Sequence, residues 1–96
     1  MKKYFVNMDY VYSSKPKTIA KFYMFEDGTN KVFIEMLDDS LSRDDIEEML
    51  VDNEFIYGDG GKRLSINNDG YEFLNNLKVQ FSGSAIRCGE IDTELV

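Results

Sequence analysis

The sequence predicts an α+β domain with a three-stranded antiparallel N-terminal meander, an acidic amphipathic helix, a β-hairpin and a second helix. Two observations predict it: alternating segments joined by short turns stand first, and two segments with helical spacing and capping residues follow. The expected order is βββαββα, and a final strand within 84–88 stays open. With no internal repeat and no linker, residues 1–96 are expected to form one domain, with 89–96 as a loosely held tail.

The N-terminal meander is expected to occupy residues 3–12, 18–26 and 31–37. Apolar residues recur at every second position along these segments, as they do in strands that bury one face. Pro16 stands in the break between the first two segments, and Gly28 stands in the short connection between the second and the third. These signals favour antiparallel strands joined by short turns.

The clearest helix start lies at Ser42, whose hydroxyl can accept a hydrogen bond from the backbone N–H of Asp45. Leu41 and Ile46 stand where a hydrophobic staple places its pair, and the apolar spacing continues to Leu50. This helix is expected to bury a narrow apolar stripe and to present carboxylates on its other side.

The second half of the chain predicts a hairpin and a helix. Two short strands, 55–57 and 63–66, flank the glycine-rich segment 58–61, which we interpret as a tight turn. A phosphate-binding loop is the other interpretation, but the P-loop spacing and a directly following helix are both missing. Residues 67–69 offer caps for a helix whose apolar positions run over 71–77.

Residues 63–74 resemble the wing strand and following helix of winged-helix proteins, which often run Leu-Thr-x-x-Gly-x-x-Tyr/Phe-Leu. Three predicted strands stand where that family has helices. The only predicted upstream helix is strongly acidic, which argues against reading of the DNA major groove. No function is carried over from this resemblance.

The net charge of −7 is located in one stretch of the chain. Residues 38–54 hold eight acidic residues and one basic residue, whereas the rest of the chain has equal numbers of each. Such a stretch repels duplex nucleic acid and attracts a basic partner. The predicted partner contacts are seven carboxylates: Asp38, Asp39, Asp44, Asp45, Glu47, Glu48 and Asp52.

No set of residues in the sequence fills the roles of a catalytic site. Histidine is absent, which removes the commonest general base, and Cys88 is the single cysteine. Zinc sites of the usual composition therefore lack ligands, and the carboxylates do not follow the calcium-loop pattern. We expect a protein that is not an enzyme, with no cofactor, no metal and no membrane span. The lack of a possible intrachain disulfide favours the cytoplasm.

These features lead to the hypothesis of a small inhibitor or decoy. Carboxylates along one helix face would occupy the basic channel of a nucleic-acid-handling enzyme and displace its ligand. Anti-CRISPR proteins, other phage antagonists and immunity proteins to nuclease toxins are of this general kind, an analogy at the level of class.

The alternative hypothesis is a small nucleic-acid-binding or regulatory domain that uses an aromatic, lysine-bearing sheet. Residues 1–37 hold eight of the aromatic residues and six lysines, and such sheets can stack single-stranded bases. Because aromatic burial dominates small cores, we expect most of these rings to lie inside. Homodimer formation through the sheet stays open.

Overall fold

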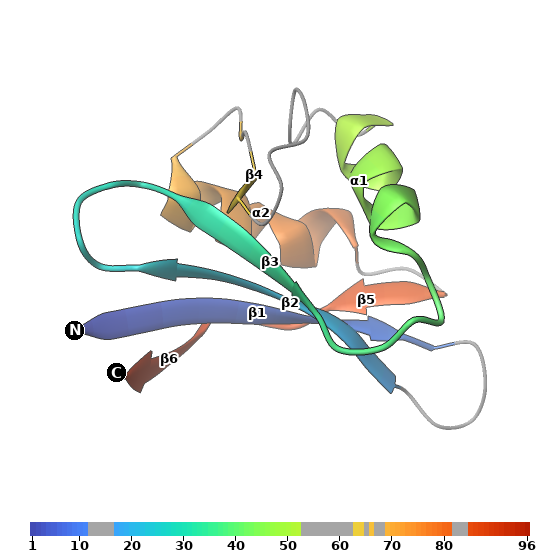
Figure 1. Ribbon diagram of the computed structural model, residues 1–96, viewed down its shortest axis with the longest axis horizontal. Helices are drawn as coiled ribbons and strands as arrows, with labels where there is room; N and C mark the ends of the chain where they lie inside the picture. The colour runs from blue at the N-terminus through green and yellow to red at the C-terminus, as the bar shows by residue number, and fades with distance from the viewer. Residues whose placement is uncertain (12–16, 53–62, 65, 67–68, 82–84) are drawn as a thin grey trace.

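The computed structural model describes residues 1–11, 17–52, 63–64, 66, 69–81 and 85–96. This part of the chain is α+β, as predicted, with one antiparallel sheet and two helices (Figure 1). The elements in chain order are β1 (Lys2–Tyr10), β2 (Lys17–Phe25), β3 (Val32–Met36), α1 (Arg43–Asp52), β4 (Arg63–Leu64), α2 (Gly70–Gln80), β5 (Ile86–Cys88) and β6 (Asp92–Leu95).

The predicted meander forms the middle of the sheet. The strand order is β4-β3-β2-β1-β5, and β6 pairs with β1 on the same side as β5. β5 pairs with the end of β1 near Tyr10, and β6 pairs with the other end of β1, near Lys2. The first and last strands are therefore neighbours, and the two chain termini lie close together (Figure 1).

Local backbone features explain how β1, β2 and β3 fit together. The register of β1 against β2 shifts between Met8 and Asp9, and beside this irregularity both Ile19 and Ala20 are buried. Gly28, in the connection from β2 to β3, has a φ of +79°, a conformation that glycine adopts without steric cost.

Both helices lie on one side of the sheet (Figure 1). The core fills the space between the helices and the sheet. Alternation along the strands sends every second side chain into this space. The fully buried side chains of greatest volume come from both layers: Phe22, Phe73, Met8, Ile19, Ile46, Leu50, Leu74, Leu77, Val6 and Val32.

The helix caps follow the sequence signals. The backbone N–H of Asp45 donates to Oγ of Ser42 over 3.1 Å, which confirms the predicted start of α1. The carboxylate of Asp69 accepts the backbone N–H of Glu72 over 3.1 Å at the start of α2. Each helix buries its apolar stripe, as the spacing predicts.

A contact distant in sequence ties the start of α2 to the sheet. The side-chain oxygen of Asn30, in the turn after β2, accepts the backbone N–H of Gly70. A Cβ atom at Gly70 would stand 3.0 Å from Sδ of Met24 and 3.1 Å from the same Asn30 oxygen. The close approach of helix and turn therefore favours glycine at this position.

In the second half of the chain, the C-terminal segment is ordered by pairing with β1. The tail 89–96 was predicted as loosely held, but Asp92–Leu95 form β6 with backbone pairing to β1, so that prediction is corrected. β6 is polar and its partner, β1, lies at the other end of the chain, so the sequence near β6 carries no signal for this pairing. Of the predicted hairpin, 63–64 form β4 against β3, while 55–57 lie outside the described residues.

Candidate interaction surfaces

The exposed side of α1 carries the main concentration of negative charge. Asp44, Asp45, Glu48 and Asp52 are all exposed, and we call this set the acidic face of α1. Asp44, Glu48 and Asp52 follow one another at four-residue spacing, so they form a row about 12 Å long at the usual helical rise. None of the four takes part in a salt bridge within the described part of the chain.

The buried stripe of α1 explains why these carboxylates point outward. Ile46 and Leu50 have no exposed surface and pack into the core. Glu48 lies on the opposite side of the helix, because it is two residues from each of them. Burial of the apolar stripe thus orients the acidic face toward solvent.

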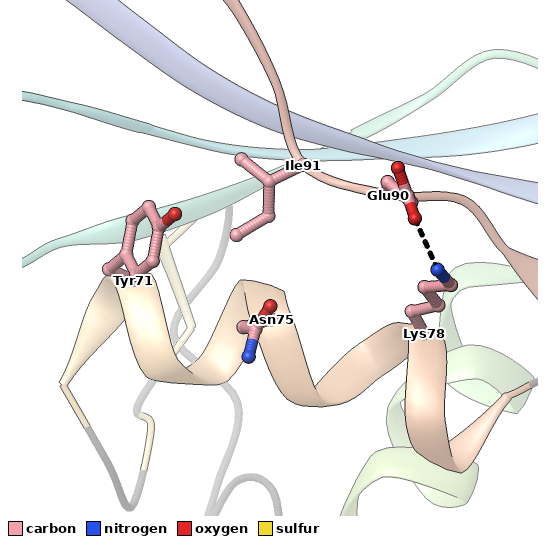
Figure 2. A pocket seen from close by; sticks show the side chains of 5 residues that line it. All are labelled: Tyr71, Asn75, Lys78, Glu90 and Ile91. Carbon is pink, nitrogen blue, oxygen red and sulfur yellow. Dashed lines mark hydrogen bonds and ion pairs between the residues drawn. The ribbon is translucent and has the colours of Figure 1, made fainter.

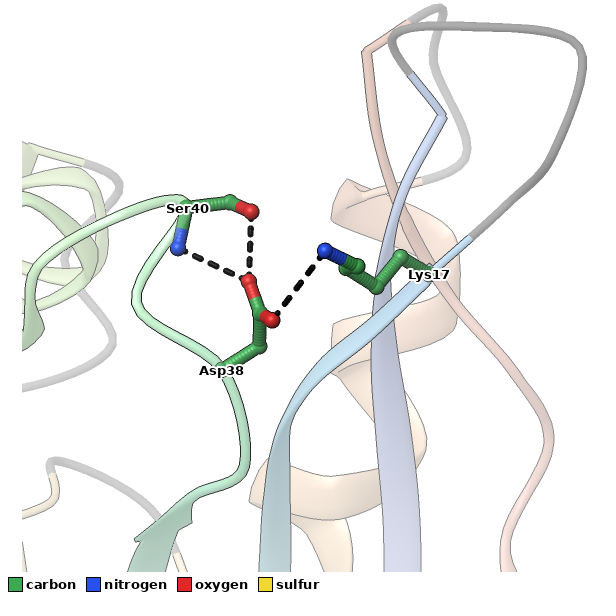
Figure 3. Close-up of polar contacts among 3 residues, drawn as sticks. All are labelled: Lys17, Asp38 and Ser40. Atoms are coloured by element: carbon green, nitrogen blue, oxygen red, sulfur yellow. Dashed lines mark hydrogen bonds and ion pairs between the residues drawn. The ribbon is translucent and has the colours of Figure 1, made fainter.

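Asp38 has a structural role in the loop between β3 and α1 (Figure 3). Its carboxylate accepts the hydroxyl and the backbone N–H of Ser40, the latter over 2.8 Å, and lies 3.2 Å from Nζ of Lys17 on β2. The hydrogen bonds from Ser40, with a smaller contribution from Lys17, hold the pKa of Asp38 below its ordinary value.

Glu47 is also engaged within the domain. Nε of Arg43 donates to its carboxylate over 2.9 Å, and both side chains are partly buried. The four-residue spacing of the two residues is a local signal that could have indicated this pair from the sequence. Of the seven predicted contact residues, the structure therefore brings four together on one exposed face, leaves Asp39 exposed in the loop before α1, and holds Asp38 and Glu47 in internal interactions.

The side of the sheet away from the helices carries a second surface. Phe5, Tyr23, Phe25 and Phe33 lie there, each partly buried, and we call this set the aromatic face of the sheet. Phe5 pairs with Tyr23, and Tyr23 pairs with Phe33, so three of the rings form a row across β1, β2 and β3. No described helix lies on this side (Figure 1).

The expectation that most N-terminal rings lie in the core is corrected for this face. Phe22 is fully buried, and Tyr4 and Tyr10 pack against the core from the helix side. The strands carry aromatic residues on both of their faces, and helices cover only one of them. Residues 22–25 of β2 are apolar or aromatic at consecutive positions, and such a run was the signal in the sequence for the second surface.

The rings of the aromatic face contact one another closely. Tyr23 and Phe33 are stacked, with centroids 5.4 Å apart and an interplanar angle of 23°. Phe25 meets Tyr23 at 5.8 Å in an edge-to-face arrangement. The ring surfaces are therefore used in large part within the face itself.

Two lysines lie over these rings. Nζ of Lys3 is 4.5 Å from the ring centroid of Tyr23, and Nζ of Lys21 is 4.8 Å from that of Phe5. Lys3 also lies 3.4 Å from the carboxylate of Glu94 on β6. Both ammonium groups are thus held by contacts within the domain.

A shallow hollow of about 230 Å³ lies between α2 and the segment before β6 (Figure 2). Figure 2 shows Tyr71, Asn75 and Lys78 on α2 facing Glu90 and Ile91, with an ion pair from Lys78 to Glu90 across it. The hydrogen bond from Lys78, together with the positive charge of Lys78, lowers the pKa of Glu90 from its ordinary value. This arrangement joins the C-terminal segment to α2.

Two further features bear on function. In the described ranges, no group of three or more acidic or cysteine residues is placed to hold a metal ion. Neither α1 nor α2 has the length and apolar content needed to cross a membrane.

Comparison with protein families, curated proteins and solved structures found no match to the chain.

Proposed function

We propose that this domain is a non-enzymatic binding protein that blocks a basic, nucleic-acid-handling protein through the acidic face of α1. The observation that carries the proposal is the row of outward carboxylates on α1 with no salt bridge in the described part of the chain. Anti-CRISPR proteins and immunity proteins to nuclease toxins exemplify this class of antagonist. The similarity that we propose is one of mechanism and not of descent.

The mechanism follows from the spacing of the charges. Carboxylates accept two parallel hydrogen bonds from an Arg side chain, and neighbours at four-residue spacing lie about 6 Å apart. A channel lined with Arg and Lys would therefore meet several carboxylates at once, and phosphates would be excluded from the same positions. The net charge of −7 also accelerates encounter with a positive surface, an effect that salt weakens.

The internal contacts divide the predicted residues by role. Asp44, Asp45, Glu48 and Asp52 are proposed to contact the partner, with Asp39, exposed in the loop before α1, assisting. Asp38 is proposed to position the loop before α1 through Ser40 and Lys17.

The alternative function, binding of single-stranded nucleic acid on the sheet, has support in the position of the aromatic face. Its ring geometry favours protein contact instead. Base stacking needs an open ring surface, but Tyr23 lies against Phe33 and beneath Lys3, and Lys21 covers Phe5. We therefore rank this function second.

The test is capture of a target from bacterial lysate by the wild-type domain and by an Asp44→Lys, Asp45→Lys, Glu48→Lys variant. We expect the wild type to capture a basic nucleic-acid-binding protein, more weakly at high salt, and the variant to bind it about 100-fold more weakly, because like charges then face each other. Purified target should lose its nucleic acid when wild-type domain is added.

The matched control makes the same charge change elsewhere, with Glu26→Lys, Asp27→Lys and Glu72→Lys, at exposed residues that form no salt bridge within the described part of the chain. This variant should retain capture, and circular dichroism should show a folded domain in all three proteins. Equal affinity of the wild type and the α1 variant for the target would refute the proposal.

A further inference from the structure

The aromatic face of the sheet has the anatomy of a protein interface. Its centre is a cluster of rings from three adjacent strands, and Phe25 and Phe33 lie 6.4 Å apart within it. Interface centres are typically rich in aromatic residues, and charged residues form the surrounding rim. The register places these charged residues on the same side of the sheet: Lys3, Lys21, Arg87, Asp9, Glu35, Asp92 and Glu94.

We infer that a second copy of this chain covers the aromatic face, so that two sheets pack face to face in a symmetric dimer. In such a dimer the same patch serves on both copies, and it must therefore complement itself. The aromatic face meets this requirement because its centre is apolar and its rim has charges of both signs. The acidic face of α1 does not meet it, since two copies would repel each other there.

The charge pattern around β2 shows this balance at short range. Lys21 stands between Asn7 on β1 and Glu35 on β3. A basic residue and an acidic residue thus lie next to each other at the rim of the face, beside the rings. Rotation of a second copy about a two-fold axis can bring each beside its opposite, which a face of one sign cannot do.

The whole side of the sheet that carries the aromatic face is also large enough for a second copy. With strands about 4.8 Å apart and residues about 3.4 Å apart along them, the strands of the sheet cover roughly 500 Å². Two copies would then bury on the order of 1,000 Å² in total, which is about the area that a specific interface requires.

This dimer leaves the acidic faces of both α1 helices outside, because the helices lie on the other side of each sheet (Figure 1). The inference is independent of the proposed target, since the mass of the protein alone tests it. A failure here would therefore leave the proposed function untouched.

The experiment is sedimentation equilibrium of the purified chain over a range of micromolar concentrations. We expect the wild type to reach twice the 11.1 kDa mass of the chain. Phe33→Lys should weaken association about 30-fold or more, because a charge would enter the aromatic centre. Val79→Lys, at a residue 74% exposed on α2, is the matched control and should associate like the wild type.

A second measurement does not depend on the folding of the Phe33 variant. A short bis-maleimide reagent should join two copies of a Lys21→Cys variant, whereas a Val79→Cys variant should stay uncoupled; the native Cys88 is buried in both. A wild type that stays monomeric, a dimer that survives Phe33→Lys, or a dimer that leaves Lys21→Cys uncoupled would each overturn the inference. Specific retention of single-stranded oligonucleotide on this face would overturn it in favour of nucleic acid.

Discussion

At the scale of single residues, Cys88 shows how position controls chemistry. It lies on β5 against Met8 of β1, and its side chain is buried in the core. Burial raises the pKa of the Cys88 thiol from 9.0 to about 12, and the negative charge of Asp9 adds to the effect. The reactive thiolate is therefore disfavoured in the folded protein.

Cys88 should make stability depend on alkaline pH. Because the folded state raises the thiol pKa, this contribution is complete below about pH 9 and is lost as the pH rises toward 12. Denaturant unfolding at a series of pH values should show a steeper alkaline loss in the wild type than in Cys88→Ala, in which Tyr and Lys groups still titrate. Identical pH dependence of the two proteins would contradict the burial argument.

At the scale of elements, α2 is tied to the sheet more firmly than α1. It buries Phe73, Leu74 and Leu77, and its start is held by Asn30 from the turn after β2. The rings of Phe22 and Phe73 meet at 6.1 Å, which joins β2 directly to the helix. α2 therefore acts as the structural helix, and α1 presents its charges from the edge of the same core.

Leu77→Ala should destabilise the domain by about 2–5 kcal/mol, because it removes a fully buried side chain and leaves a cavity. Val79→Ala, two residues along the same helix, should change the free energy of unfolding by less than about 0.5 kcal/mol. Chemical denaturation of both variants measures the difference. Similar losses in the two variants would show that the burial pattern of α2 is wrong.

At the scale of the whole molecule, the sheet separates two surfaces of different chemistry. The acidic face of α1 lies on the helix side, and the aromatic face lies on the other side (Figure 1). The core between them consists of apolar side chains, with no buried charged residue in the described part of the chain. The residues of the two surfaces therefore do not contact each other directly, so a substitution on one surface should leave binding at the other surface unchanged.

The two surfaces should act independently. The triple Lys variant of α1 should keep the mass of the wild type in sedimentation, and Phe33→Lys should still bind the target at a single site. Combining the substitutions should give effects that add, as is usual for sites without shared contacts. A loss of self-association on changing α1 alone would show that the surfaces are coupled.

Much of the fold could be predicted because its signals are local. The caps at Ser42 and Asp69 lie within three residues of the groups they bind, and the structure confirms both. The three long strands follow from alternation within a few residues. By contrast, the contact from Asn30 to Gly70 joins distant segments, and neither residue carries a signal for it.

The candidate site was predictable to a similar extent. The position of the charge in the chain and the helical spacing indicated the acidic face of α1. The sequence did not separate Asp38 from Asp39, because only the fold brings Lys17 of β2 to the first of them. The contacts of Asp38 with Ser40 and of Glu47 with Arg43 join residues two and four positions apart, so sequence spacing alone could have indicated them.

The sequence by itself determined the α+β class, the capped helices and the location of the net charge, since periodicity, caps and charge act over a few residues. The tertiary structure decided that the helices cover one side of the sheet, that β6 pairs with β1 and that four aromatic rings lie on the other side. Strands that carry apolar residues on both faces leave open which face is buried. Packing resolves it, because the apolar stripes of α1 and α2 can cover only one side of the sheet.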